Sequence, residues 1–135
     1  MADTLTPDKR SWNMSRIRST NTKPEMIVRK LLHSLGCRFR LHKKDLPGKP
    51  DIVLKKYKIV IFVHGCFWHQ HKRCKRSNIP KSNMSYWKPK LNRNTKRDNQ
   101  HKADLKRADW RTIVIWECET KTIEKLEKKL IKSLS

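Results

Sequence analysis

The segment LPGKPDIVLKKYKIVIFVHGCFWHQH, residues 46–71, decides the fold of this chain. Two strand-like runs, DIVLKK at residues 51–56 and KIVIFV at 58–63, are separated by so few residues that an antiparallel hairpin is the economical arrangement. The second run is apolar at every position from Ile59 to Val63, as expected of a central strand buried on both faces. The segment therefore predicts a sheet that ends in a loop rich in histidine and cysteine.

The flanking sequence adds helices and further strands. Apolar residues recur at helical spacing between Thr22, a plausible N-cap, and Gly36, a typical helix terminator. Further strands are predicted at residues 37–42 and 111–118, and helices at 22–36, 94–108 and 121–134, with a loop from residue 82 to the second helix. A helix between strands 58–63 and 111–118 makes these two strands parallel. The prediction is an α/β sandwich on a mixed sheet.

The division of the chain follows from the same patterns. Residues 22–135 are long enough for one domain with one core. Residues 1–21 are polar and basic and mostly without periodicity, which predicts an N-terminal arm that orders on its partner.

The charge of the chain indicates its partner. Lys and Arg number 34 against 12 Asp and Glu, a formal net charge of +22. Such a surplus favours repeated phosphate contacts, so nucleic acid is the leading partner and an anionic membrane the alternative. The longest apolar run is far too short to span a bilayer, and no signal peptide opens the chain. These features predict a soluble, intracellular protein with no membrane partner.

The cysteines predict a metal site. Parallel strands finish at the same sheet edge, which brings Cys66 and Cys118 together, and the following loop can add Cys74 and a histidine. A closed set of four such ligands is typical of structural zinc. Spacing does not choose between His69 and His71. The alternative is ordinary buried cysteines beside solvated histidines.

A catalytic site is predicted at the same end of the sheet. Asp51 begins one hairpin strand and His64 ends the next, so their side chains are expected at one mouth of the sheet. A carboxylate there could hold Mg²⁺ and an imidazole could transfer protons at neutral pH. Structural roles compete: Asp51 can cap a turn, Glu25 suits a capping box, and Asp98 can pair with lysines on its helix.

Residues 46–71, together with Arg97-Asp98 and the IVIWEC segment ending at Cys118, resemble the very short patch repair (Vsr) endonucleases over about residues 11–118. The resemblance implies a restriction-endonuclease-like fold, a three-layer sandwich with a central mixed sheet and a structural zinc. Most nucleases of that fold carry an acid-x-Lys triplet where this chain has Phe62, Val63 and His64. The Vsr branch shares this departure.

The resemblance also implies residue roles. Asp51 would bind Mg²⁺ with the main-chain carbonyl of Val63, His69 would act as acid or base, and His64, Asp98 and Glu25 would support them. Zinc would be held by Cys66, His71, Cys74 and Cys118. Between His71 and Cys74 stand two residues, where one would be expected from the family.

The implied activity is Mg²⁺-dependent nicking of double-stranded DNA on the 5′ side of the T in a T:G mismatch, the lesion left by 5-methylcytosine deamination. Unstacking a wobble pair is easier than unstacking a Watson–Crick pair, and inserted rings recover the lost stacking. The implied intercalating residues are Phe67, Trp68, Trp87 and Met14, for which core packing is the alternative. The expected backbone contacts are Lys88, Lys90, Arg93, Lys96 and Arg97.

A single asymmetric lesion suits a monomer, acting at the nucleoid in the bacterial cytoplasm. Two other functions stay open from the residues. One is a zinc-stapled DNA-binding protein without catalysis, in which Asp51 only caps a turn. The other is a nuclease of the same fold that cuts a junction or a flap.

Overall fold

A four-stranded mixed sheet forms the centre of the protein. The computed structural model describes residues 22–79 and 81–134. The strand order is β1-β2-β3-β4, with both β1·β2 and β2·β3 antiparallel and β3·β4 parallel. The strands are β1 (Arg40–Leu41), β2 (Ile52–Leu54), β3 (Ile59–His64) and β4 (Arg111–Trp116). The hairpin, the parallel pair and the α/β class are thus confirmed, and the N-terminal arm with Met14 lies outside the described residues.

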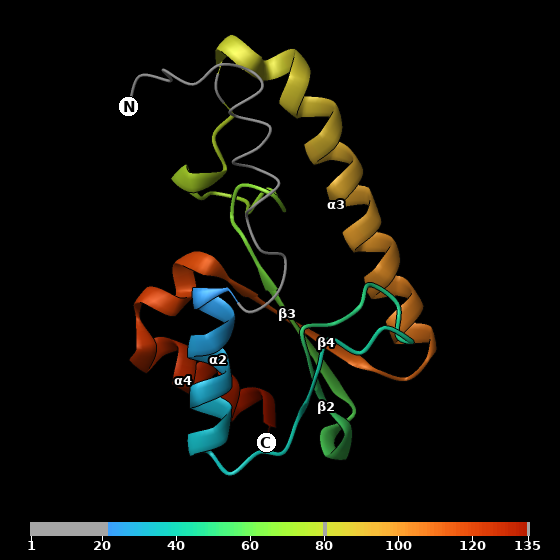
Figure 1. Ribbon diagram of the computed structural model, residues 1–135, viewed down its shortest axis with the longest axis vertical. Helices are drawn as coiled ribbons and strands as arrows, with labels where there is room; N and C mark the ends of the chain where they lie inside the picture. The colour runs from blue at the N-terminus through green and yellow to red at the C-terminus, as the bar shows by residue number, and fades with distance from the viewer. Residues whose placement is uncertain (1–21, 80, 135) are drawn as a thin grey trace.

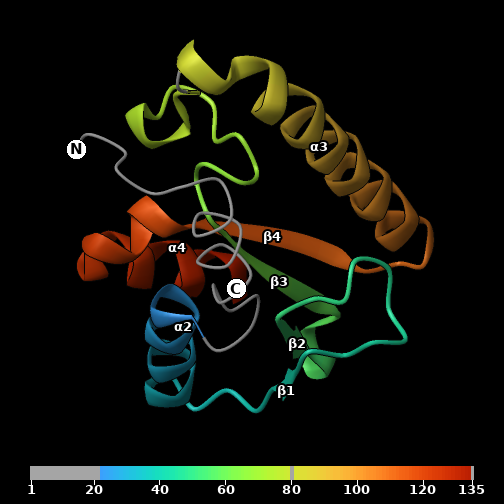
Figure 2. The ribbon, with the colours of Figure 1, turned by 45° about the horizontal axis from the view of Figure 1, so that its top comes forward.

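Helices cover both faces of this sheet, as Figures 1 and 2 show. Helices α2 (Lys23–Ser34) and α4 (Ile123–Leu134) lie on one face, where Val28, Leu32, Leu126 and Leu130 pack against apolar side chains of β2, β3 and β4. Helix α3 (Met84–Arg107) crosses the other face and buries Leu105 against β2 and β3. The result is a three-layer arrangement. None of the described helices is both long and apolar enough to cross a membrane.

The hairpin determines which residues lie beside the C-terminal end of β3. A short 3-10 turn at Lys55–Tyr57 joins β2 to β3, and Lys58 completes it with a left-handed φ of 56°. Ile52 then pairs with Ile61, and Leu54 with Ile59. Asp51 therefore precedes β2 beside the last residues of β3.

Helix α3 begins about ten residues earlier than the sequence predicted. We expected a loop from residue 82 to the start of the helix at residue 94. A proline such as Pro89 disfavours a helix interior, because it lacks an amide hydrogen and clashes with the preceding turn. The structure starts the helix at Met84 and keeps Pro89 within it. Trp87 and Leu91, four residues apart, are both buried, so their packing outweighs the local cost of the proline. In Figure 1 the first turns lie at an angle to the rest of α3, as a proline within a helix explains.

The two edges of the sheet are short or covered. A strand was predicted over residues 37–42, but β1 is only two residues long, and both residues are exposed. At β4, on the opposite edge, the Lys129 ammonium donates to the carbonyl oxygen of Val114 at 2.8 Å and also pairs with Glu119. Cys118 lies just beyond β4 in a 3-10 helix, Glu117–Lys121, rather than in the predicted strand.

Candidate active site and metal centre

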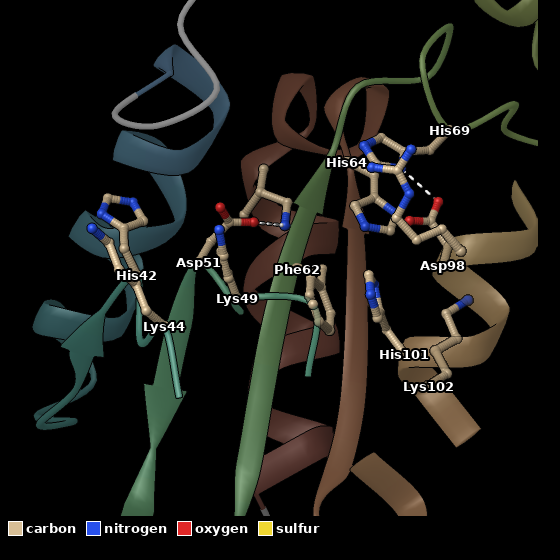
Figure 3. Close-up of a pocket in the computed structure, with 13 residues that line it drawn as sticks. His42, Lys44, Lys49, Asp51, Phe62, His64, His69, Asp98, His101 and Lys102 are labelled. Carbon is tan, nitrogen blue, oxygen red and sulfur yellow. Dashed lines mark hydrogen bonds and ion pairs between the residues drawn. The ribbon is translucent and has the colours of Figure 1, made fainter. Parts of the chain in front are cut away.

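A cleft of about 510 Å³ opens between the C-terminal end of β3, the loop before β2, and α3 (Figure 3). Asp51 and His64 both line it, as predicted from the strand ends. Asp98 of α3 and His69 of the loop after β3 lie beside His64, across the cleft from Asp51. The remaining lining residues are His42, Lys44, Gly48, Lys49, Phe62, Val63, Arg97, His101 and Lys102.

Asp51 is held by the backbone of the central strand. Its Oδ2 accepts a hydrogen bond from the Val63 amide at 2.7 Å. Burial raises the pKa of Asp51 from 3.8 to about 6, the nearby Glu25 adds to the rise, and the Val63 amide opposes it. The carboxyl group is thus a desolvated acid beside the end of β3, and not simply the cap of a surface turn.

Glu25 takes part in a buried network and not only in the helix cap. Thr22 caps α2 as predicted, accepting from the Glu25 amide at 3.3 Å. The Glu25 side chain is 1% exposed and pairs with the Arg29 guanidinium. His42 Nε2 donates to the two carboxylate oxygens of Glu25 at 3.2 and 3.0 Å. Ligand atoms of Glu25, His42 and Asp51 all lie within 4.8 Å of one another, a group that could hold a metal ion.

Sequence reasoning missed His42. The only available signal was register: Leu41 pairs with Ile52, so the next residue, His42, stands opposite Asp51. Its amide donates to the Asp51 carbonyl at 3.0 Å. Without knowing the register, nothing in the sequence distinguished His42 from the other histidines.

Two histidines and a carboxylate form the opposite wall. His69 Nδ1 donates to Asp98 Oδ2 at 2.6 Å, and the rings of His64 and His69 stack with centroids 3.7 Å apart. Burial, aided by the nearby His69, lowers the pKa of His64 to about 3, so His64 is neutral at physiological pH. Burial, the largest single effect, tends to raise the pKa of Asp98, but the hydrogen bond from His69 and the electrostatic effects of His69, His64 and Lys102 together lower it. A carboxylate that stays ionised therefore orients the His69 ring.

A second cluster lies beyond the end of the sheet. One ligand atom from each of Cys66, His71, Cys74 and Cys118 lies within 4.8 Å of the others, which makes this group a potential metal site. The structure places His71 here, whereas His69 groups with His64 and Asp98. Arg73 adopts a left-handed φ of 60°, so the backbone turns sharply within the two-residue spacer before Cys74.

The raised pKa of Cys66 fits a cation site. Burial raises the pKa of the Cys66 thiol to about 12, so a thiolate there needs a positive charge beside it. Cys37 lies outside the cluster and packs against the main core.

Stacked rings connect the two clusters. The His71 ring lies on Trp116 with centroids 4.2 Å apart and an interplanar angle of 10°. The edge of Trp116 meets His64 at 5.4 Å, and His64 in turn stacks on His69. The cysteine and histidine cluster therefore supports one wall of the cleft through direct ring contacts.

An aromatic cluster lies above the cleft. The rings of Phe67, Trp68 and Trp87 contact one another edge to face with centroids 5.2–5.6 Å apart, and Tyr86 packs on Trp87. Phe67 and Trp68 are half-buried, and Trp87 is buried. The five predicted backbone-contact residues, Lys88, Lys90, Arg93, Lys96 and Arg97, are all exposed on α3.

Comparison with known proteins agrees with this geometry. Residues 2–76 match the family model described as DNA mismatch endonuclease Vsr. The type II nicking enzyme V.XorIIP of Xanthomonas oryzae pv. oryzae is 50% identical over 130 residues, covering 96% of this chain and 95% of the relative. The DNA mismatch endonuclease Vsr of Escherichia coli is 38% identical over 126 residues, covering 93% of this chain and 80% of the relative.

A cleft lined by aspartates and histidines in so basic a chain, with relatives of this kind, defines a DNA endonuclease. The chain belongs to the Vsr family of DNA mismatch endonucleases.

Proposed function

We propose that this protein nicks double-stranded DNA on the 5′ side of the T in a T:G mismatch left by 5-methylcytosine deamination, using Mg²⁺ and a structural zinc. The observation that carries the proposal is the cleft in which Asp51, beside Glu25, faces the His69–Asp98 pair. Residues 22–135 would be the catalytic domain, in a restriction-endonuclease-like arrangement suggested by the mixed sheet with helices on both faces.

The donor set at Asp51 fits Mg²⁺, which prefers oxygen ligands. Because Val63 directs its amide to Asp51, and a strand residue points its N–H and C=O the same way, the Val63 carbonyl also faces Asp51. Asp51, Glu25 and that carbonyl would hold the ion. Bound there, Mg²⁺ would supply Lewis acidity and positive charge beside the scissile phosphate.

His69 is the group that moves a proton. Because Asp98 accepts from Nδ1, the Nε2 atom is left to act in the cleft. It can take a proton from the attacking water or give one to the departing 3′ oxygen, leaving a 5′-phosphate and a 3′-hydroxyl. His64, neutral and stacked on His69, fixes the plane of that ring.

The second cluster fits zinc. Tetrahedral zinc with Zn–S near 2.3 Å and Zn–N near 2.0–2.1 Å separates sulfur from nitrogen by about 3.6 Å, and Cys118 Sγ lies 3.5 Å from His71 Nδ1. Three sulfurs and one nitrogen complete the ligand set without an open position. We therefore assign this site a structural role.

The aromatic cluster and α3 would bind the DNA. Phe67, Trp68 and Trp87 offer stacking faces beside the cleft, and the wedge residue Met14 belongs to the proposed DNA-contacting arm at residues 1–21. The exposed lysines and arginines of α3 would contact phosphates. Such a substrate places the enzyme, as a monomer, at the nucleoid of the bacterial cytoplasm.

The test of this proposal is a substrate panel with Mg²⁺. We expect one strand of a T:G duplex to be nicked and the matched duplex, a flap and a junction to be left intact. Preferential cutting of the flap or junction would reject the mismatch assignment, and binding without cutting of any substrate would reject catalysis.

Replacing His69 by Gln should slow nicking of the T:G duplex by about 10²–10⁴-fold, the usual contribution of a positioned acid or base. DNA affinity should change little, because glutamine retains a polar side chain of similar reach. Single-turnover nicking with saturating enzyme measures the effect. His33→Gln, on an exposed part of α2, is the control and should cut normally. A His69 variant as fast as the wild type would remove the role given to this ring.

The raised pKa of Asp51 predicts a pH-dependent need for metal. As pH falls through about 6, Asp51 takes up a proton and loses the charge that binds a cation. The Mg²⁺ concentration for half-maximal nicking should then rise about tenfold per pH unit below this value. Magnesium titrations at several pH values measure this. An unchanged requirement between pH 7.5 and 5 contradicts the assignment.

Replacing Trp68 by Ala should weaken mismatch nicking. Stacking on an aromatic ring contributes about 1–3 kcal/mol per base, or ~5–150-fold. Nicking of the T:G duplex at limiting DNA should fall within this range. Full activity at limiting DNA would indicate that Trp68 only packs against its neighbours.

A further inference from the structure

His42 stands where a metal ligand would stand. Its Nε2 lies 3.0 Å from Glu25 Oε2, and the ligand atoms of Glu25, His42 and Asp51 share a space less than 4.8 Å across. Octahedral ligands around one ion, with bonds near 2.0–2.1 Å, lie about 3–4 Å apart. The three side chains thus suit a single cation without large movement, with the imidazole hydrogen on Nδ1 and the bond from Nε2 to Glu25 replaced by a bond from Nε2 to the ion.

The backbone holds His42 in this position. Leu41 pairs with Ile52 at the end of β1, and the His42 amide donates to the Asp51 carbonyl at 3.0 Å. Glu25 reaches the same point from the first turn of α2 and is 1% exposed. Figure 3 shows His42 on the Asp51 side of the cleft, across from His64 and His69. The imidazole is therefore fixed beside both carboxylates by secondary structure.

Arg29 changes what kind of cation this group would favour. Its guanidinium pairs with Glu25, which offsets one of the two carboxylate charges at the cluster. A weaker local charge lowers the attraction for a hard ion such as Mg²⁺, whose binding depends on oxygen ligands and charge. A nitrogen ligand instead strengthens binding of first-row transition ions, which accept imidazole readily.

We propose that His42 is a third side-chain ligand of the cation held by Asp51 and Glu25, and that this site binds Mn²⁺ in preference to Mg²⁺. The inference rests on the proposed function, because it takes the catalytic cation to lie at Asp51. It goes beyond that function in naming a nitrogen ligand and the class of ion it selects.

Mn²⁺ binding to the zinc-loaded full chain tests this proposal. Free Mn²⁺ is followed by electron paramagnetic resonance during titration of the wild type, His42→Gln and the exposed control His33→Gln. We expect His42→Gln to weaken Mn²⁺ binding by about tenfold or more, since even outer-shell changes typically cost 10–100-fold. Competition with Mg²⁺ should show that the Mg²⁺ affinities of His42→Gln and the wild type differ by less than about threefold, because the oxygen ligands of Mg²⁺ remain in the variant. Equal Mn²⁺ affinity in the wild type and His42→Gln overturns the proposal.

A second measurement does not depend on the variant's folding. Pulsed electron paramagnetic resonance of Mn²⁺ on the wild type should detect a directly bound imidazole nitrogen. Its absence overturns the proposal even if His42→Gln fails to fold. Where the variant folds, its signal should be lost, while a signal that persists assigns the nitrogen to another histidine and rejects His42.

Nicking assays separate this inference from the proposed function. Loss of Mn²⁺ binding in His42→Gln, with no T:G nicking by the wild type in either metal, would support the ligand and reject the activity. Normal nicking with Mn²⁺ affinity independent of His42 would support the activity and reject the ligand.

Discussion

Asp51→Asn should all but abolish nicking of a T:G duplex while leaving DNA binding intact. The asparagine carbonyl can still accept the hydrogen bond that the Val63 amide makes to Asp51 Oδ2 at 2.7 Å, so the end of the sheet should keep its shape. What disappears is the negative charge that would hold the proposed cation. Loss of several kcal/mol of charge stabilisation at the phosphate corresponds to about 10³–10⁵-fold in rate.

The matched control is Asp45→Asn. Asp45 is also an aspartate in the chain before β2, but its side chain is 73% exposed and only loosely paired with Lys43. Single-turnover nicking and gel-shift affinity should both match the wild type in this control. If Asp51→Asn instead cuts at the rate of the control, the cation does not sit at Asp51 and the proposed mechanism fails.

Cys118→Ser should remove the zinc and much of the stability of the fold. Cys118 lies just after β4, whereas the other three proposed ligands lie between the end of β3 and residue 74. A zinc ion bound by all four would tie a long loop to the sheet. Structural zinc contributes about 10–16 kcal/mol in small domains, comparable to the whole stability of a typical protein. The melting temperature should therefore fall by at least about 10 °C.

Zinc content after purification and thermal unfolding measure this outcome together. The control is Cys37→Ser, at the edge of the core and outside the cluster, which should keep one equivalent of zinc and lose far less stability. A Cys118→Ser protein that retains a full equivalent of zinc and the wild-type melting temperature contradicts the site.

Topology made much of this arrangement predictable from sequence. Strand ends are fixed by the apolar runs, and the helix between β3 and β4 requires the two strands to be parallel. Four of the site residues lie at strand ends. Their positions predicted that Asp51 would lie near His64 and that Cys66 would lie near Cys118. The start of α3 could not be predicted in this way, because the burial of Trp87 depends on aromatic partners contributed by a distant loop.

Residues inside the loop after β3 could be placed only by the structure. A loop has no repeating geometry, so the spacing of His69 and His71 does not tell in which direction each side chain points. The structure sends His71 to the cysteines and His69 to Asp98, across contacts that span 47 and 29 residues. His42 was missed for a similar reason, because its position depends on the pairing of a strand only two residues long.

That short strand has a consequence for behaviour on DNA. Unpaired strand edges invite intermolecular β-sheet formation, and a polyanion that gathers many copies of a basic chain raises their local concentration. Here β1 offers only two residues to a neighbour, and on the far edge Lys129 occupies a Val114 carbonyl oxygen. Molecules crowded along one duplex would thus find only two residues to pair with at the β1 edge, and at the β4 edge a carbonyl that already has a partner.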